Sequence, residues 1–174
     1  MTLDVRELST DAAIAAAYRL ARQLRDRIRE DTFLAEVRRQ AIQGYRLYGG
    51  FEDGRLVALA GVRRSHTLSS GEHLFVDDLV TAEDARGRGH GRAMLGWLGR
   101  QAADDGIPRI YLDSRATAKG FYESVGFTFL TAIPCWKETA RGYLFKDKEL
   151  TPDGAQQLKL KEGEEGAAQI KFKG

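Results

Sequence analysis

The chain has 174 residues, of which 27 are basic and 25 acidic, so its formal net charge is +2. With 43% hydrophobic and 30% charged residues, the composition is typical of one folded globular domain and excludes disordered or collagen-like chains. No stretch approaches the ~18 consecutive apolar residues of a membrane span, and the N-terminus carries acids where a secretory signal would be basic and then apolar. We therefore expect a cytoplasmic protein with no membrane partner.

Cysteine and histidine usage excludes two kinds of site. Cys135 is the only cysteine, so an internal disulfide is excluded, and the three scattered histidines give no metal-ligand spacing, so we expect no metal. Nineteen of the basic residues are arginine, and all eight lysines lie at or beyond Lys119. A balance of +2 does not by itself indicate nucleic acid, and we expect no such partner.

The first predicted elements are a strand over residues 3–7 and a pair of helices. Capping side chains from Ser9 onward precede an alanine-rich stretch and predict a helix over 11–24. Apolar residues at three-to-four spacing predict a second helix from near Asp31 to Gly44, a typical terminator.

Strands then dominate the pattern. Two extended runs are joined by Asp53-Gly54, a strong hairpin signal. Residues 73–81 predict another strand, which leads through a glycine-rich loop into a helix that ends at Gly106. The last predicted elements are a strand, a helix and a strand, over 109–114, 116–126 and 127–133. This order predicts an α/β fold, with a mixed sheet and helices on its faces.

Residues 141–174 show a weaker pattern, with charged and apolar residues alternating in short pieces between glycines. We divide the chain into a domain over residues 1–140 and a C-terminal extension over 141–174. Extra strands, a dimerisation arm or a partly ordered tail would all fit the extension.

The loop between the strand over 73–81 and the next helix is the candidate binding site. Backbone N–H groups at a helix N-terminus lack intrahelical partners and carry the positive end of the helix dipole, so they bind anions. Glycines let the backbone approach phosphate oxygens, and arginines add charge-assisted bonds. Together, these backbone N–H groups, glycines and arginines predict that the loop binds a ligand with a pyrophosphate group. The loop lacks both the Gly-Lys-Ser/Thr ending of a P-loop and the spacing of a Rossmann fingerprint.

Two segments together resemble the GNAT N-acetyltransferase superfamily. The first is similar to its acetyl-coenzyme A signature, Arg/Gln-x-x-Gly-x-Gly/Ala after a strand, and consists of Asp78-Leu79-Val80-Thr81 and Arg86-Gly87-Arg88-Gly89-His90-Gly91. The second runs from Ala118 to Phe127 and is similar to Ala-x-x-Phe-Tyr-x-x-x-Gly-Phe. The resemblance covers roughly residues 3–132.

The resemblance implies an acetyltransferase domain whose mostly antiparallel sheet is splayed at the coenzyme site, and acetyl-CoA as co-substrate. The pantetheine arm would pair like an added strand with the backbone of Leu79 and Thr81. The pyrophosphate would lie on the N–H groups of the loop. The coenzyme-binding residues implied in this way are Leu79, Val80, Thr81, Arg86, Gly87, Arg88, Gly89, His90, Gly91, Arg92 and Phe121.

Three residues are candidates for catalysis. The resemblance implies that Tyr122 lies beside the thioester sulfur and protonates the departing thiolate, a role that a phenol of pKa about 10 can fill. The acceptor amine must be neutral to attack, so a base or a water relay is expected. Asp77 and Asp78 are the candidate bases. Strand alternation would direct one to each face. The resemblance favours Asp77, because its side chain would point to the same face of the strand as the carboxylates that act as base in the family.

The predicted function is acetyl transfer to a primary amine by direct attack in a ternary complex. The acceptor, a small-molecule or protein amine, stays open, and an arginine-rich first helix lining its cleft would favour an anionic acceptor. A coenzyme A-binding regulatory or interaction module without turnover is the alternative. Nucleic-acid binding by the arginine-rich helices is a third reading. The resemblance also favours a homodimer.

Overall fold

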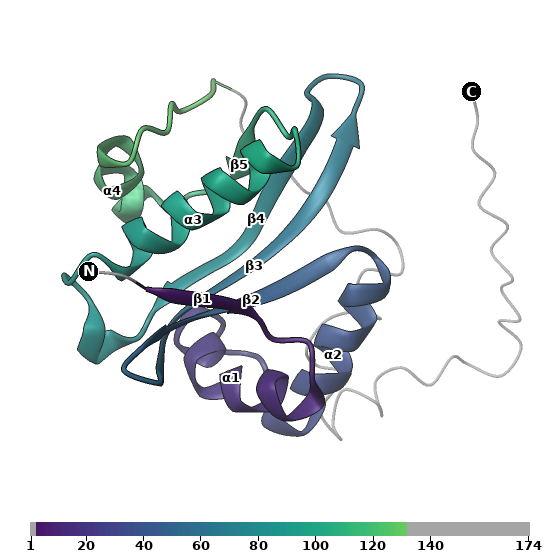
Figure 1. The fold of residues 1–174 in the computed structure, drawn as a ribbon, viewed down its shortest axis with the longest axis vertical. Coiled ribbons are helices and arrows are strands. Elements are labelled where there is room, and N and C mark those ends of the chain that lie inside the picture. The colour runs from purple at the N-terminus through teal and green to yellow at the C-terminus, as the bar shows by residue number, and fades with distance from the viewer. Residues whose placement is uncertain (1–2, 132–174) are drawn as a thin grey trace, which may run out of the picture. The chain divides into compact units, whose positions relative to one another are not determined.

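The computed structural model describes residues 3–131 (Figure 1). The chain divides into two compact units, Met1–Thr128 and Phe129–Gly174, and the elements below all belong to the first. The predicted extension over 141–174 lies outside the described residues. Among the helices of the described part, none is long and apolar enough to cross a membrane.

Five strands form one sheet in the order β1-β2-β3-β4-β5. The first four are antiparallel neighbours, and β5 runs parallel to β4. A parallel neighbour needs a crossover connection, and a helix supplies it. The bounds are β1 (Asp4–Glu7), β2 (Tyr45–Glu52), β3 (Arg55–Thr67), β4 (Gly71–Thr81) and β5 (Ile110–Leu112). The predicted mixed, mostly antiparallel sheet is confirmed.

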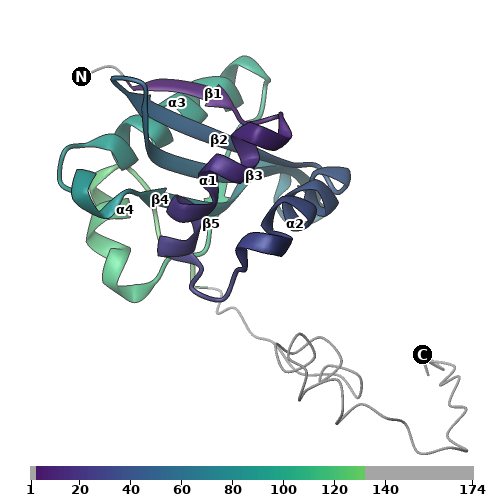
Figure 2. The same ribbon diagram turned by 90° about the horizontal axis from the view of Figure 1, so that it is seen from below.

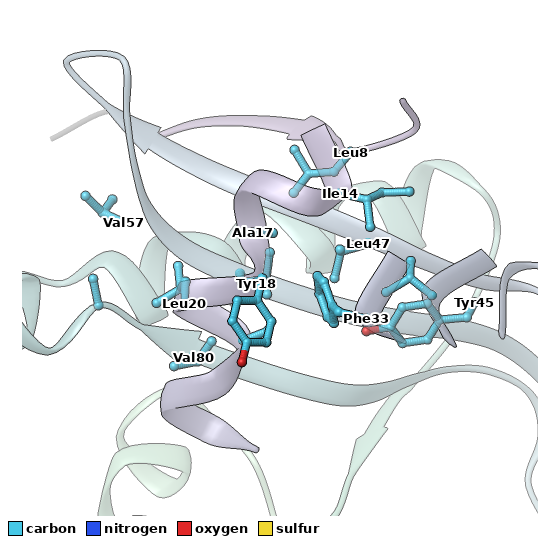
Figure 3. Packing of buried hydrophobic residues seen from close by; sticks show 14 of the residues in the cluster. Leu8, Ile14, Ala17, Tyr18, Leu20, Phe33, Tyr45, Leu47, Val57 and Val80 are labelled. Atoms are coloured by element: carbon cyan, nitrogen blue, oxygen red, sulfur yellow. The ribbon is translucent and has the colours of Figure 1, made fainter. Parts of the chain in front are cut away.

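Helices cover both faces of the sheet (Figure 1, Figure 2). One face carries α1 (Asp11–Leu24) and α2 (Glu30–Ile42), and its core includes Tyr18, Phe33 and Leu47 (Figure 3). The other face carries α3 (His90–Asp104), which is the crossover helix and buries Met94 and Leu98. The short α4 (Lys119–Ser124) follows β5 on this second face. Two single-turn 3₁₀ helices complete the chain order: η1 (Glu83–Ala85) precedes α3, and η2 (Ala116–Ala118) precedes α4.

Local sequence signals explain where several elements begin. The Thr10 hydroxyl accepts a hydrogen bond from the Ala13 N–H (3.2 Å) and caps α1, which satisfies one of the donors that a helix start leaves unpaired. Asp53 (φ 49°) and Gly54 (φ 76°) both lie in the left-handed region, as the tight turns of two-residue hairpins require. Both predictions, the helix over 11–24 and the hairpin, are confirmed.

The end of the described chain differs from the prediction. The expected helix over 116–126 is reduced to η2 and α4, and no strand forms over 127–131; residues 132 and 133 lie outside the described part. The Phe127 N–H donates to the Tyr122 carbonyl (3.0 Å), so it closes the end of α4 and is not free for a sheet ladder. The strand predicted over 109–114 is likewise reduced to β5.

A close approach between two strands fixes the position of Tyr45. A Cβ atom at Gly61 would lie only 1.8 Å from the Tyr45 hydroxyl oxygen, so only glycine leaves room for this ring on β3. Tyr45 is buried in the core beneath α2 (Figure 3). Its hydroxyl donates to Oδ2 of Asp78 (2.9 Å).

We predict that Gly61→Ala lowers the free energy of unfolding by about 1–3 kcal/mol, because the added methyl displaces the Tyr45 ring from a packed core. Urea unfolding measures the change. The control is Gly99→Ala on α3, where an added Cβ meets no atom within 4 Å. That exchange should stabilise the helix by about 0.5–1 kcal/mol. Equal stability of Gly61→Ala and the wild type would contradict the prediction.

Candidate active site

The outer edge of β4 is open along its second half. β5 pairs with β4 only over Leu74–Val76, although β4 continues to Thr81. The Ala82 N–H donates to the Val57 carbonyl on β3 (2.8 Å). Backbone groups of successive strand residues point to opposite edges, so those of Leu79 and Thr81 point away from β3 to the open edge. The expected splay of the sheet is confirmed.

The glycine loop delivers the N-terminus of α3 to this edge. Gly87 (φ 76°) and Gly89 (φ 86°) adopt left-handed conformations that other residues rarely adopt. No side chain caps α3, and its first intrahelical bond runs from the Ala93 N–H to the Gly89 carbonyl (2.9 Å). The N–H groups of residues 90–92 therefore lack helical acceptors. They form a site for an anion, strengthened by the helix dipole.

The open edge of β4, the glycine loop and α4 border an open cavity of about 510 Å³. It brings together most of the residues predicted to contact the coenzyme, together with Tyr122. Its walls are Leu79, Thr81, Arg86, Gly87, Gly89, His90, Gly91, Arg92, Ala118, Phe121 and Tyr122. An elongated ligand with amide groups at one end and a diphosphate at the other fits this combination of donors.

Two of the predicted coenzyme-binding residues lie outside this cavity. The Val80 side chain is buried in the core beneath α1 (Figure 3). Arg88 turns to the end of β2, where its guanidinium lies 2.8 Å from Oε2 of Glu52. Sequence reasoning missed Glu52, because the loop and β2 meet only in the folded chain.

Arginines of the loop region also hold the cavity together. Arg92 donates to the Ser124 carbonyl (3.1 Å) and hydroxyl (3.2 Å), so the first turn of α3 is tied to the end of α4. Arg86 Nε lies 3.4 Å from the Thr81 carbonyl. The two Arg92 contacts hold α4 against the start of α3, and with it the position of Tyr122.

Tyr122 is half-buried on the cavity wall. Its ring packs edge-to-face against Phe121 (5.1 Å between centroids) and Phe127 (5.6 Å). Burial raises the pKa of the Tyr122 hydroxyl above its ordinary value, because a phenolate would lose hydration in this apolar setting. The hydroxyl therefore keeps its proton at neutral pH and is available as a donor.

A β-bulge places both candidate carboxylates on one face of β4. Asp78 pairs with Gly61 and Val76 pairs with Val62, so Asp77 is the extra residue. The Val76 side chain packs on the α3 side, but both aspartates line a cavity on the α1 side. The expectation that alternation directs one to each face is wrong, because a bulge interrupts that alternation.

Arginines and a tyrosine surround the two carboxylates. Arg63 binds Asp77 with two nitrogens, with Nε 2.7 Å from Oδ2. Arg25 Nε donates to Oδ1 of Asp78 (2.8 Å), and the Tyr45 hydroxyl donates to the other oxygen, Oδ2. Burial first, and then the charge of Asp78, raises the pKa of Tyr45 far above its ordinary range, so Tyr45 stays protonated. Sequence reasoning missed Tyr45 and Arg63, since only the register of β2, β3 and β4 brings them to the aspartates.

The cavity on the α1 side has a volume of about 520 Å³. Apolar side chains of α1 and α2 form its walls, and Arg25, Arg27 and Arg115 are its cations. Arg115 follows β5, yet it donates to the Leu24 carbonyl at the end of α1 (3.1 Å), so the cavity extends past the open edge of β4. Apart from His90, every basic residue that lines either cavity is an arginine. Between residues 3 and 131, no cluster of His, Cys, Asp and Glu side chains could hold a metal ion.

Comparison with known proteins agrees with this architecture. The description of the acetyltransferase (GNAT) family matches residues 12–127. An uncharacterized N-acetyltransferase, YhdJ of Bacillus subtilis, is 28% identical over 132 residues, which are 72% of this chain and 92% of YhdJ. The chain belongs to the acetyltransferase (GNAT) family and is an acyltransferase with acetyl-CoA as its co-substrate.

Solved structures share the fold. A Trypanosoma brucei acetyltransferase superposes with a TM-score of 0.63 at 21% identity, over 78% of this chain and 99% of that one. A predicted acetyltransferase from Clostridium acetobutylicum, solved with acetyl-CoA, gives 0.62 at 18% identity, over 78% and 96%.

We predict that Gly91→Val weakens acetyl-CoA binding at least about tenfold, which is about 1.4 kcal/mol. A Cβ atom there would lie 3.2 Å from the Phe121 ring and 3.4 Å from the Thr81 hydroxyl oxygen, so the larger side chain narrows the cavity. Calorimetric titration measures the dissociation constant. The matched control is Gly96→Val, the same exchange at an exposed position of α3, and it should bind like the wild type. Equal weakening by both variants would point to a general effect on α3 instead.

Proposed function

We propose that this protein transfers the acetyl group of acetyl-CoA to a primary amine by direct attack in a ternary complex. The observation that carries the proposal is that β4 forms a wall of two cavities. Leu79 and Thr81 face the cavity with the glycine loop, whereas Asp77 and Asp78 face the cavity beneath α1 and α2. The open edge of β4 lies between them, so an acyl donor on one side can meet an amine from the other.

The backbone of this chain provides most of the contacts for the donor. The open-edge groups of Leu79 and Thr81 hydrogen-bond an amide-rich arm as a neighbouring strand would. The N–H groups at the start of α3 hold the diphosphate. Acetyl-CoA supplies the activated thioester, and backbone N–H groups near its carbonyl favour the charge that develops on attack.

The two catalytic tasks fall to groups on opposite sides of the open edge. Tyr122 donates its proton to the departing thiolate, because it is protonated and lies on the wall of the coenzyme cavity. Asp77 or Asp78 receives the proton of the amine, directly or through water. The position of Asp77 in the strand, compared with that of the carboxylates in the family, favours Asp77. Both aspartates line the cavity beneath α1 and α2, and substitution of each one distinguishes between them.

The amine acceptor lies in the cavity of about 520 Å³, which accommodates a small molecule or the end of a protein side chain. Four acidic residues line it together with the three arginines, namely Asp26, Glu36, Asp77 and Asp78. Because these charges nearly balance, the cavity does not favour an anionic acceptor over a cationic one. The preference for an anionic acceptor that the arginine-rich helix suggested thus gains no support here.

Release of free thiol from acetyl-CoA in the presence of an amine panel tests the proposed function. We predict that Tyr122→Phe lowers kcat about 10²-fold, since it removes the proton donor, while the dissociation constant of acetyl-CoA stays near the wild-type value. Because burial raises the pKa of Tyr122, this acid should cause no fall in kcat below about pH 10. Equal losses in kcat and binding would remove Tyr122 from this role. Binding without thiol release for any amine would favour the module without turnover.

We predict that replacing the base, by Asp77→Asn or Asp78→Asn, lowers kcat/KM about 10²-fold near pH 7. The loss should shrink as the pH approaches the pKa of the amine, about 10, where the amine becomes neutral without help. Asp105→Asn, at the exposed end of α3, is the control and should retain activity. Wild-type rates for both aspartate variants at pH 7 would show that neither acts as the base.

A further inference from the structure

Beneath the glycine loop lies a buried histidine whose side chain has no part in the proposed function. His90 is the first residue of α3 and only 2% exposed. Its Nε2 atom has no hydrogen-bond partner among the described residues. The nearest acidic atom is Oε2 of Glu52, at 3.7 Å, which is beyond hydrogen-bonding distance. Buried polar atoms without partners are rare in folded proteins and call for an explanation.

Glu52 lies at the end of β2 with its side chain 17% exposed. It contacts Arg88 of the loop as well as facing His90. A shift of about 1 Å would bring Oε2 within hydrogen-bonding distance of Nε2. Glu52 can therefore serve as the counter-ion of a protonated His90 without any rearrangement of the strand.

Positive charge predominates in the loop region around His90. Four arginines and two carboxylates give an excess of two positive charges, and the N-terminal end of the α3 dipole adds to it. The charged and titratable side chains that line the coenzyme cavity or form ion pairs beside the loop are Glu52 on β2, Arg55 on β3, Asp84 on η1, Arg86 and Arg88 in the loop, Arg92 on α3 and Tyr122 on α4.

We propose that His90 takes up a proton when a diphosphate binds at the N-terminus of α3, and that Glu52 positions and neutralises the resulting imidazolium. The inference rests on the proposed coenzyme site. The two negative charges of the diphosphate cancel the excess of positive charge. The new N–H of the imidazolium then gives the unpartnered Nε2 atom a bond to Glu52, and this bond is charge-assisted. His90 and Glu52 are thus positioning residues for the coenzyme and not members of the catalytic pair.

Linkage fixes the direction of the pH effect. Because a proton is taken up on binding, affinity is highest at low pH and falls as the pH rises through the range in which an imidazole loses its proton. We expect affinity to fall up to about tenfold between pH ~5.5 and pH ~8.5.

Calorimetric titration near pH 7 in buffers of different ionisation enthalpy measures the proton uptake directly. Acetyl-dephospho-CoA is the probe, because a phosphate monoester such as the 3′-phosphate titrates near pH 6 itself. The wild type should take up about 0.3–1 proton per ligand bound. His90→Gln should abolish the uptake, since an amide nitrogen near Nε2 does not titrate. The matched control, His66→Gln at an exposed position on β3, should leave uptake unchanged.

Glu52→Gln separates positioning from a general effect on the fold. It should reduce proton uptake and flatten the pH dependence of affinity. Binding by the wild type with the same heat in every buffer would overturn the inference, and so would uptake that persists in His90→Gln. If neither acetyl-CoA nor its dephospho form bound to the wild type, the proposed coenzyme site itself would be wrong, and the inference would fall with it.

Discussion

The candidate site depends on the loss of one strand neighbour. β4 is paired on both edges from Leu74 to Val76, and from there it continues with a partner only on the β3 side. Backbone donors and acceptors that are partly shielded from water but not paired are unfavourable, so this edge has a strong tendency to accept an extended ligand. The glycine loop, α3 and α4 are all arranged around that edge. A ligand bound there completes the sheet.

The β-bulge in β4 determines which acidic groups face the cavity beneath α1 and α2. By adding Asp77 to the pairing of β4 with β3, it brings two carboxylates to one face. Two adjacent negative charges would repel each other, and Arg63 and Arg25 compensate them. The missing side chain of Gly61 makes room for Tyr45, which reaches Asp78 from β2. Groups from β2, β3 and β4 and from the end of α1 therefore together determine the hydrogen bonds and ion pairs of these two carboxylates.

Local signals in the sequence were sufficient for much of the fold. The Thr10 cap and the Asp53-Gly54 turn act within a few residues, so the helix and the hairpin that depend on them could be predicted. The glycine loop is also local, and its place between strand and helix was correct. The motifs, taken with the family resemblance, named most of the residues that line the cavity at the open edge of β4, because most of that lining lies in two short segments.

Contacts between distant segments could not be predicted in this way. The bulge at Asp77 depends on the register with β3, and the turn of Arg88 toward Glu52 depends on where β2 ends. The strand expected over 127–133 has strand-like composition. However, the N–H of Phe127 is already used at the end of α4, and composition does not report such competition.

The use of arginine, and not lysine, on the cavity walls has a chemical consequence. A lysine amine is itself an acetyl acceptor once it loses its proton, and it would compete with any substrate amine beside an activated thioester. A guanidinium stays protonated at every pH at which amines react, so it supplies charge without becoming a nucleophile. The arginines of the cavity walls are therefore not acetyl acceptors, and their own charge stays constant over the pH range in which amines react.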